Sequence, residues 1–197
     1  MSRINAKIYL GLIHHPIYNK NGEKITTTIT NLDLHDISRA GKTYDVEKYF
    51  VINHLKSQQA LVKRMQDYWT SGFGSDYNQN RQEAFSVLNI SDNLDDVLEE
   101  IKEETGKEAI LIATDAKEFP NSKSYIEMRE LIYNSDRPYL IIYGTGWGLT
   151  EETLDRCDYI LDPIYGRGDF NHLSVRSAAS IIMDRLLSPA WWEKDNK

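Results

Sequence analysis

The residues best suited to chemistry form a glycine-rich run at positions 144–148 (GTGWG), directly after the apolar run at 139–143. Thr150 is a suitable N-cap, and the acidic Glu151 and Glu152 would stabilise the positive end of a helix that begins there. Glycines at the end of a strand allow a ligand to approach the backbone closely. Because ligands bind at this edge of open α/β sheets, we expect a ligand site at 144–148.

The spacing of these glycines narrows the class of ligand. A dinucleotide-binding loop would need glycine at position 149, which is Leu149, and the Gly-Lys-Ser/Thr of a P-loop is absent. Phosphate binding is therefore not predicted. A second glycine-containing stretch, residues 165–170 (YGRGDF), follows the next apolar run. Two neighbouring strand ends of this kind favour a flat base with a polar tail, such as an adenosine. The alternative is a tight turn in which glycine serves only the backbone.

The elements that must position these residues are short apolar runs with helical stretches between them. The runs lie at 8–13, 48–53, 109–113, 139–143 and 159–164. They do not alternate with polar residues, which is typical of strands buried on both faces. Leu94, Val97, Leu98 and Ile101 have helical spacing, as do Val175, Ala178, Ala179, Ile182 and Leu186. We therefore predict one α/β domain, residues 1–197, with a parallel sheet flanked by helices.

Two further segments carry local signals. Asn21-Gly22 indicates a tight turn at the tip of an excursion after the first strand. Residues 71–81 (SGFGSDYNQNR) predict a long polar loop, of the kind that is often functional.

Composition excludes several classes of protein. The 197 residues are 41% hydrophobic and 27% charged, which is unlike a disordered chain. A single cysteine, Cys157, excludes an intrachain disulfide and a multi-cysteine zinc site, and favours the cytoplasm. Neither a membrane span nor a signal peptide is predicted. The net charge of −7 excludes a generic nucleic-acid-coating protein, so RNA binding would need a local basic patch or a partner.

The order of elements and two short motifs resemble the SPOUT class of RNA methyltransferases, which have the α/β-knot fold. After the glycine turn come a short helix, a strand ending near Pro163, and the run LSVRSAA at 173–179. In this class a Leu-Asn-Val-Ser-like run followed by small residues often introduces the last helix. Ser174 and Arg176 stand here where 2′-O-methylating members have Asn and Ser.

A second motif upstream is similar to the first SPOUT motif, in which Arg follows a helix-opening Asn by six residues. Here Asp33 occupies the Asn position and Arg39 the Arg position. The small knotted domain that is sometimes fused to a tRNA guanine-N1 methyltransferase is the nearest resemblance.

The resemblance implies a C-terminal trefoil knot, S-adenosylmethionine as cofactor, a homodimer, and methylation of tRNA or rRNA. Leu161, Ile164 and Leu173 would enclose the adenine. The implied cofactor-binding residues are Thr114, Tyr143, Gly144, Thr145, Gly146, Gly148, Leu161, Ile164, Leu173 and Ser174. The implied catalytic residues are Asp33, Arg39 and Asp169. Asp115 and Asp162 also lie near strand ends, and any of these carboxylates could instead serve only as a loop cap. Arg39 could instead pair with Asp33 or Asp36 on the helix surface.

Several other residues have both a functional and a purely structural interpretation. Adjacent His14 and His15 would point to opposite faces of a strand, so no metal site is predicted. Cys157 is interpreted as an inert buried thiol. The residues of a candidate RNA-facing strip are Lys56, Lys63, Arg64, Arg81, Tyr68, Trp69 and Tyr77. A solvated helix face is the alternative for that strip, and Trp191-Trp192 is a candidate dimer contact.

Two other functions stay open at this point. One is an α/β domain that binds another nucleotide without methyl transfer. The other is a cofactor-binding, non-catalytic dimer module that serves a partner RNA-modifying enzyme.

Overall fold

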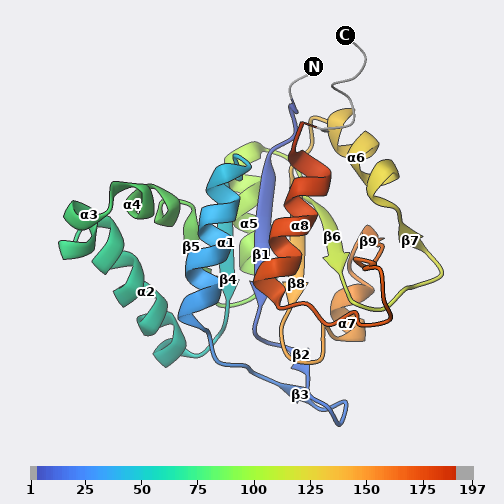
Figure 1. Ribbon diagram of the computed structural model, residues 1–197, viewed down its shortest axis with the longest axis horizontal. Coiled ribbons are helices and arrows are strands. Elements are labelled where there is room, and N and C mark those ends of the chain that lie inside the picture. Colours follow the sequence, from blue (N-terminus) through green and yellow to red (C-terminus); the bar gives the residue numbers. More distant parts are fainter. Residues whose placement is uncertain (1–3, 190–197) are drawn as a thin grey trace.

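The computed structural model describes residues 4–189, in which a seven-stranded sheet has the order β5-β4-β1-β8-β6-β9-β7 (Figure 1). Its strands are β1 (Ile8–Ile13), β4 (Lys48–Ile52), β5 (Leu88–Ser91), β6 (Ile110–Thr114), β7 (Ser122–Lys123), β8 (Tyr139–Gly144) and β9 (Tyr159–Leu161). All the pairings in this sheet are parallel. The predicted parallel α/β sheet and its five predicted strands are confirmed. The sequence did not reveal β5 and β7, because these short strands lack a continuous apolar run.

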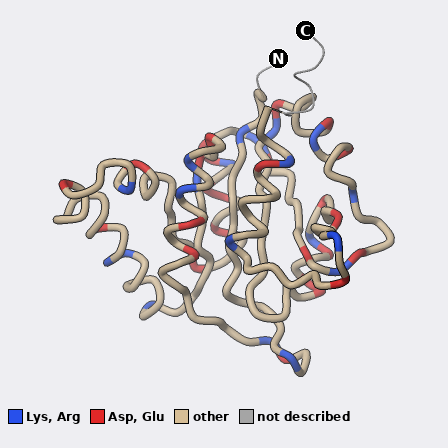
Figure 2. Tube along the Cα trace, viewed as in Figure 1, with Lys and Arg blue, Asp and Glu red and all other residues tan. Residues whose placement is uncertain are grey.

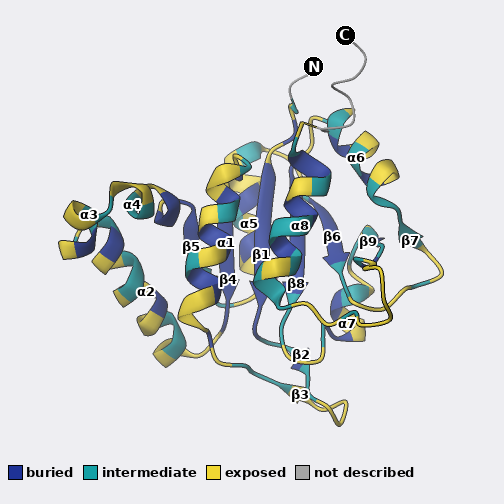
Figure 3. Ribbon diagram, viewed as in Figure 1, coloured by how far each residue is buried: buried dark blue, intermediate teal, exposed yellow. Residues whose placement is uncertain are grey.

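Helices cover both faces of the sheet. They are α1 (Asn31–Thr43), α2 (Lys56–Thr70), α3 (Phe73–Tyr77), α4 (Gln79–Phe85), α5 (Leu94–Thr105), α6 (Tyr125–Tyr133), α7 (Glu151–Leu154) and α8 (Val175–Leu187). Helices α1, α6 and α8 pack on one face, and α5 packs on the other. Strands β1, β6, β8 and β9 contain no charged residue, and the Lys, Arg, Asp and Glu residues gather on the surrounding helices and loops (Figure 2). The strands are accordingly the most buried part of the chain (Figure 3).

The cap predicted at Thr150 is confirmed, and two other helix ends are equally well defined. Gly106 ends α5 with a φ of 70°, a left-handed conformation that glycine adopts without strain. The Thr150 side chain caps α7 by accepting a hydrogen bond from the Thr153 amide. In the same way Ser174 caps α8 by accepting from the Ser177 amide.

The excursion after β1 is an antiparallel hairpin of β2 (Ile17–Tyr18) and β3 (Lys24–Ile25), with Gly22 near its tip at a φ of 77°. This confirms the turn predicted from Asn21-Gly22.

The prediction of a long loop at 71–81 is wrong, because this stretch contains α3 and the start of α4. Asn78 caps α4 by accepting a hydrogen bond from the Arg81 amide at 3.0 Å. Gly74 brings α3 against Trp69, since a Cβ there would lie 2.6 Å from the Trp69 ring. The Asn78 cap is a local signal that the sequence prediction missed, whereas the packing of Gly74 on Trp69 depends on the preceding helix.

Among residues 4–189, no helix is both long and apolar enough to span a membrane. The same residues contain no cluster of His, Cys, Asp and Glu suited to hold a metal ion. The candidate dimer contact Trp191-Trp192 lies outside the described residues.

Candidate active site

A cavity of about 740 Å³ opens at the carboxyl ends of β6, β8 and β9. This volume lies within the usual range for small-molecule sites. Eight of the predicted cofactor-binding residues line it: Thr114, Tyr143, Gly144, Thr145, Gly146, Gly148, Ile164 and Leu173. Leu161 and Ser174 do not. Leu161 is 1% exposed in the core between the sheet and its helices, and Ser174 is the cap of α8.

The rest of the cavity wall combines apolar side chains with polar and charged ones, among them Lys117, Asn171, His172 and two carboxylates. Val175, Ala178 and Ile182 contribute from α8, and Asp115 and Asp162 from the ends of β6 and β9. The sequence placed both carboxylates at strand ends but gave no reason to prefer them over Asp169. Only the register of neighbouring strands shows that Asp115 and Asp162 reach the cavity.

The glycine turn after β8 is held by the hairpin after β1. The Tyr18 amide donates to the Gly148 carbonyl at 3.1 Å, and the Trp147 amide donates to the Tyr18 carbonyl at 3.0 Å. A Cβ on Gly146, which has a φ of 59°, would lie 2.7 Å from Ile17 Cδ1 and 3.0 Å from the Tyr18 carbonyl oxygen. Gly146 therefore lines the cavity, but the reason that it must be glycine is the close approach of the hairpin.

A series of hydrogen bonds that runs through Thr27 to His14 fixes the Thr145 side chain. Thr145 Oγ1 donates to the Ile13 carbonyl at 3.0 Å, and Thr27 Oγ1 lies 2.6 Å from Thr145 Oγ1. His14 Nδ1 lies 3.0 Å from Thr27 Oγ1. Since a hydroxyl has one proton, Thr27 must donate to Thr145, and His14 must donate to Thr27 through Nδ1–H. Burial lowers the pKa of His14 to about 4, so the neutral ring with its proton on Nδ1 is the form at neutral pH.

Tyr143 brings an unusual group to the cavity wall. Its hydroxyl is buried and has no hydrogen-bond partner among the described residues. Burial, and then the nearby Tyr125, raise the pKa of Tyr143 well above its usual value, so the hydroxyl keeps its proton. A buried hydroxyl without a partner is costly, and the hydroxyl of Tyr125, which also lines the cavity, is buried without a partner within residues 4–189 as well.

None of the three predicted catalytic residues lines the cavity. Asp33 is 6% exposed, accepts a hydrogen bond from Thr30 Oγ1 at 2.6 Å, and lies 3.7 Å from Arg176 Nη1. Arg176 also pairs with Asp36, at 3.3 Å. The possible pairing of Arg39 with Asp33 or Asp36 is therefore wrong, because α8 supplies their cation. Arg39 is exposed further along α1, and Asp169 is exposed in the loop after β9.

Comparison with known proteins identifies the family. Residues 7–188 match the family described as SAM-dependent RNA methyltransferase. An uncharacterised protein of Aquifex aeolicus is 40% identical over 94% of this chain and 90% of its own length. The tRNA (guanine-N(1)-)-methyltransferase of Nitratidesulfovibrio vulgaris is 37% identical over 96% of this chain. This chain spans only 44% of that relative, and 44% of a relative with the same name from Oleidesulfovibrio alaskensis.

Solved structures share the fold at low sequence identity. A putative methylase family protein from Neisseria gonorrhoeae has a TM-score of 0.62 and 14% identity, over 95% of this chain and 84% of that protein. The SpoU methyltransferase AviRb from Streptomyces viridochromogenes, in complex with AdoMet, has a TM-score of 0.55 and 16% identity, over 94% and 58%. These likenesses confirm the resemblance to SPOUT proteins at the level of the fold. With the match over residues 7–188, they show that this chain belongs to the family of S-adenosylmethionine-dependent RNA methyltransferases.

Proposed function

We propose that this chain transfers a methyl group from S-adenosylmethionine to a tRNA. The observation that carries the proposal is the cavity at the ends of β6, β8 and β9, in a chain whose family uses this cofactor. The names of the two relatives from Nitratidesulfovibrio and Oleidesulfovibrio support tRNA as the substrate class. The test below distinguishes a tRNA substrate from an rRNA substrate.

The cavity residues suit the cofactor chemically. Ile164, Leu173 and Val175 offer apolar surface for an adenine ring. Asp115 and Asp162 complement the positive charges of the sulfonium and the amino group. The Tyr143 hydroxyl is a donor for a polar group of the ligand. When bound, S-adenosylmethionine supplies an electrophilic methyl group on a positively charged sulfur.

The three predicted catalytic residues then have separate roles. Asp169 lies two residues before Asn171, which lines the cavity, and its exposed carboxylate would accept the proton of an RNA nucleophile that carries one. Arg39 is exposed on α1 and would contact an RNA phosphate. Asp33 would act through Arg176 as a positioning residue that fixes the start of α8 against α1.

The trefoil knot and the homodimer belong to the same proposal. The likeness to SpoU-type structures supports both, and α8 returns from the far side of β6 to pack beside α1 (Figure 1). Leu32, Phe170 and Leu173 are 57%, 79% and 46% exposed near the starts of α1 and α8, where a second copy would cover them. An RNA-modifying enzyme of this kind would work in the cytoplasm. Light scattering should give twice the chain mass of 22.8 kDa, and a monomer would contradict the dimer.

The test is methyl transfer from labelled S-adenosylmethionine to separate pools of unmodified tRNA and rRNA. Label should enter the tRNA pool. Asp169→Asn should lower the single-turnover rate at saturating cofactor by about 100-fold or more, with unchanged cofactor affinity. Asp136→Asn is the control, because Asp136 is exposed just before β8, at the opposite ends of the strands from the cavity, where it pairs with Lys107. Label in rRNA alone would correct the substrate class. Cofactor binding without transfer to either pool would favour a non-catalytic module that serves a partner RNA-modifying enzyme.

A further inference from the structure

Residues 55–86, here called the helical arm, contain α2, α3 and α4 and are inserted between β4 and β5 (Figure 1). The arm projects from the β5 side of the sheet. Its inner side packs on α1, where the His35 ring lies 5.5 Å from Trp69 and 4.7 Å from Phe85 between ring centroids. The cavity lies beyond β1, towards the other edge of the sheet, so the proposed methyl-transfer site makes no use of the arm.

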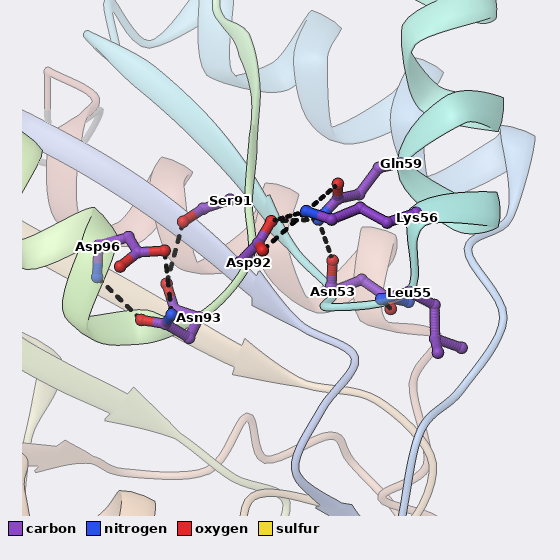
Figure 4. A network of polar contacts seen from close by, with 8 residues as sticks. All are labelled: Asn53, Leu55, Lys56, Gln59, Ser91, Asp92, Asn93 and Asp96. Atoms are coloured by element: carbon purple, nitrogen blue, oxygen red, sulfur yellow. Dashed lines mark hydrogen bonds and ion pairs between the residues drawn. The ribbon is translucent and has the colours of Figure 1, made fainter.

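The start of the arm is fixed to the carboxyl ends of the strands, the same end of the sheet at which the cavity opens. Helix α2 begins just after Asn53, at the carboxyl end of β4. Lys56 pairs with Asp92 at 2.8 Å, and Gln59 Nε2 donates to Asp92 at 2.5 Å and to the Asn53 carbonyl at 2.7 Å (Figure 4). These contacts give the arm a defined direction relative to the strand ends.

The outer side of the arm exposes aromatic rings. Phe73 and Tyr77 are 74% and 78% exposed, and their spacing of four residues places them on one side of α3. Tyr68 is 44% exposed on α2, and its ring lies 4.9 Å from that of Trp69. The Arg81 guanidinium lies 4.3 Å from the centre of the Trp69 ring. Phe73 and Tyr77 therefore expose most of their rings, whereas the Tyr68 ring is partly covered by Trp69 and Gly74.

Cations accompany these rings. Leu61, Arg64 and Tyr68 share a face of α2, and no carboxylate lies within 4 Å of Arg64 among the residues described. Arg39 is exposed one helical turn after His35, whose ring contacts Trp69 and Phe85, so Arg39 lies on the side of α1 that faces the arm. Arg81 lies over the Trp69 ring at the same junction. Arg39, which the first SPOUT motif singles out, thus lies beside the arm and not in the cavity.

The net charge of the chain is distributed unevenly along the sequence. Residues 1–86 contain 11 Lys and Arg against 8 Asp and Glu, a net charge of +3. Residues 87–197 contain 12 against 22, a net charge of −10, which together give the −7 of the chain. A polyanion is therefore repelled less by the first 86 residues, which include α1 and the arm, than by the rest of the chain.

We infer that the helical arm is a docking surface for the RNA substrate. Exposed aromatic rings next to arginines are the combination that binds unstacked bases and their phosphates. The inference rests on the proposed RNA methyltransferase function and adds where the RNA is held outside the cavity. It places bases of an RNA loop on Phe73, Tyr77 and Tyr68, and phosphates at Arg64 and Arg39.

The experiment measures binding of a fluorescent unmodified tRNA transcript without cofactor, at several salt concentrations. The double variant Phe73→Ala/Tyr77→Ala should bind at least about fivefold more weakly. Arg64→Ala should lower the slope of log affinity against log salt by about 0.7, and Arg64→Lys should restore it. Ile126→Ala, which removes a side chain 72% exposed on α6, is the matched control. Cofactor binding by each variant should equal that of the unmodified chain.

Three outcomes would overturn the inference. The first is an unchanged tRNA affinity in both the double variant and Arg64→Ala. The second is a change from dimer to monomer in Phe73→Ala/Tyr77→Ala, which would assign these rings to a contact between two copies. The third is a wild-type chain that binds cofactor but no tRNA. Because the assay needs no methyl transfer, a chain that binds tRNA through the arm without methylating it would contradict the proposed function alone.

Discussion

The turn after β8 and the loop after β9 border the same cavity and both contain closely spaced glycines, yet they are built differently. In the turn, Gly146 and Gly148 have φ values of 59° and 103°, and the hairpin residues Ile17 and Tyr18 press against it. In the loop, Gly166 and Gly168 have no atom within 4 Å of an added Cβ and no positive φ. The turn is fixed before any ligand arrives, whereas the loop is exposed.

The difference shows which part of the site the protein forms by itself. The turn is tied to β1 through Thr145 and Thr27 and to the hairpin through Tyr18. The loop has few ties, among them a hydrogen bond from Asn171 Nδ2 to the Ala116 carbonyl at 2.8 Å. A preformed segment such as the turn lowers the entropy cost of binding a ligand, whereas an exposed segment such as the loop can adapt its conformation to a second substrate. We therefore expect the turn to determine cofactor affinity, and substitutions in the loop to have small effects.

The largest effect is expected for Gly146→Ala. An added Cβ would lie 2.7 Å from Ile17 Cδ1 at a φ that disfavours alanine, so the hairpin must move away from the turn. The variant should lose about 2–4 kcal/mol of unfolding free energy and at least tenfold in cofactor affinity. Urea unfolding and calorimetric titration with S-adenosylmethionine measure the two.

The control for Gly146→Ala is Gly22→Ala, which has a φ of 77° but no atom within 4 Å of its added Cβ. It carries the backbone strain without the contact to the turn. Cofactor affinity should stay unchanged in Gly22→Ala. A loss of unfolding free energy in Gly146→Ala no larger than that in Gly22→Ala would mean that backbone strain alone explains it, and that the contact with Ile17 adds nothing.

The same contrast explains how much of the molecule the sequence predicts. The five apolar runs were recognisable because strands buried on both faces leave an uninterrupted pattern. The steric reason for glycine at position 146 cannot be read from the sequence. The side chain that a Cβ would meet there, Ile17, belongs to a hairpin far away in the chain. Thr27 and Thr145 are 118 positions apart, and Arg176 pairs with Asp33 and Asp36 across two helices. Local patterns predict elements and strand ends, but pairing between side chains depends on packing that no local pattern encodes.

Acid should loosen the turn through His14. Its pKa is about 4 in the folded protein and about 6.5 when unfolded, so between these values only the unfolded chain binds the proton. Stability from this group is fully present above pH 6.5 and is lost as the pH falls towards 4, by about 2–3 kcal/mol. Denaturant unfolding from pH 7 to pH 4 measures the loss.

His14→Asn supplies the comparison for this pH dependence, because an amide donor can replace Nδ1–H but does not titrate. The variant should show a smaller loss of stability between pH 6.5 and pH 4 than the unmodified chain. Parallel curves for the two proteins would show that His14 is not protonated on unfolding in this range.

Thr27→Val should cut the link between His14 and Thr145. The replacement keeps the shape of the side chain but leaves the His14 Nδ1–H without its acceptor, which costs about 1–3 kcal/mol. Thr145 also loses a donor, so cofactor affinity should fall several-fold. Thr27→Ser keeps the hydroxyl and should restore both quantities. If serine restores stability but not cofactor affinity, the methyl group of Thr27 and not its hydrogen bonds orients Thr145.

Tyr143→Phe should move stability and affinity in opposite directions. Removing a buried hydroxyl without a partner should stabilise the ligand-free protein by about 1 kcal/mol. If that hydroxyl donates to the cofactor, affinity should fall about fivefold at the same time. Tyr49→Phe is the matched control, because its hydroxyl is also buried without a partner but lies outside the cavity. An affinity loss of equal size in Tyr49→Phe would show that neither hydroxyl meets the ligand directly.

The smallest effect is expected for Gly168→Ala in the loop after β9. An added Cβ meets no atom within 4 Å, and the φ of Gly168 lies outside the left-handed region that disfavours alanine. Alanine lowers the entropy of the unfolded chain, so the unfolding free energy should stay equal or rise by up to about 0.5–1 kcal/mol. Cofactor affinity should stay within about twofold of the unmodified chain, because the preformed turn and not this loop is expected to determine it. A tenfold loss of affinity with unchanged stability would contradict that division: it would mean that Gly168 adopts a positive φ only when the ligand is bound, and that the loop, too, is part of the cofactor site.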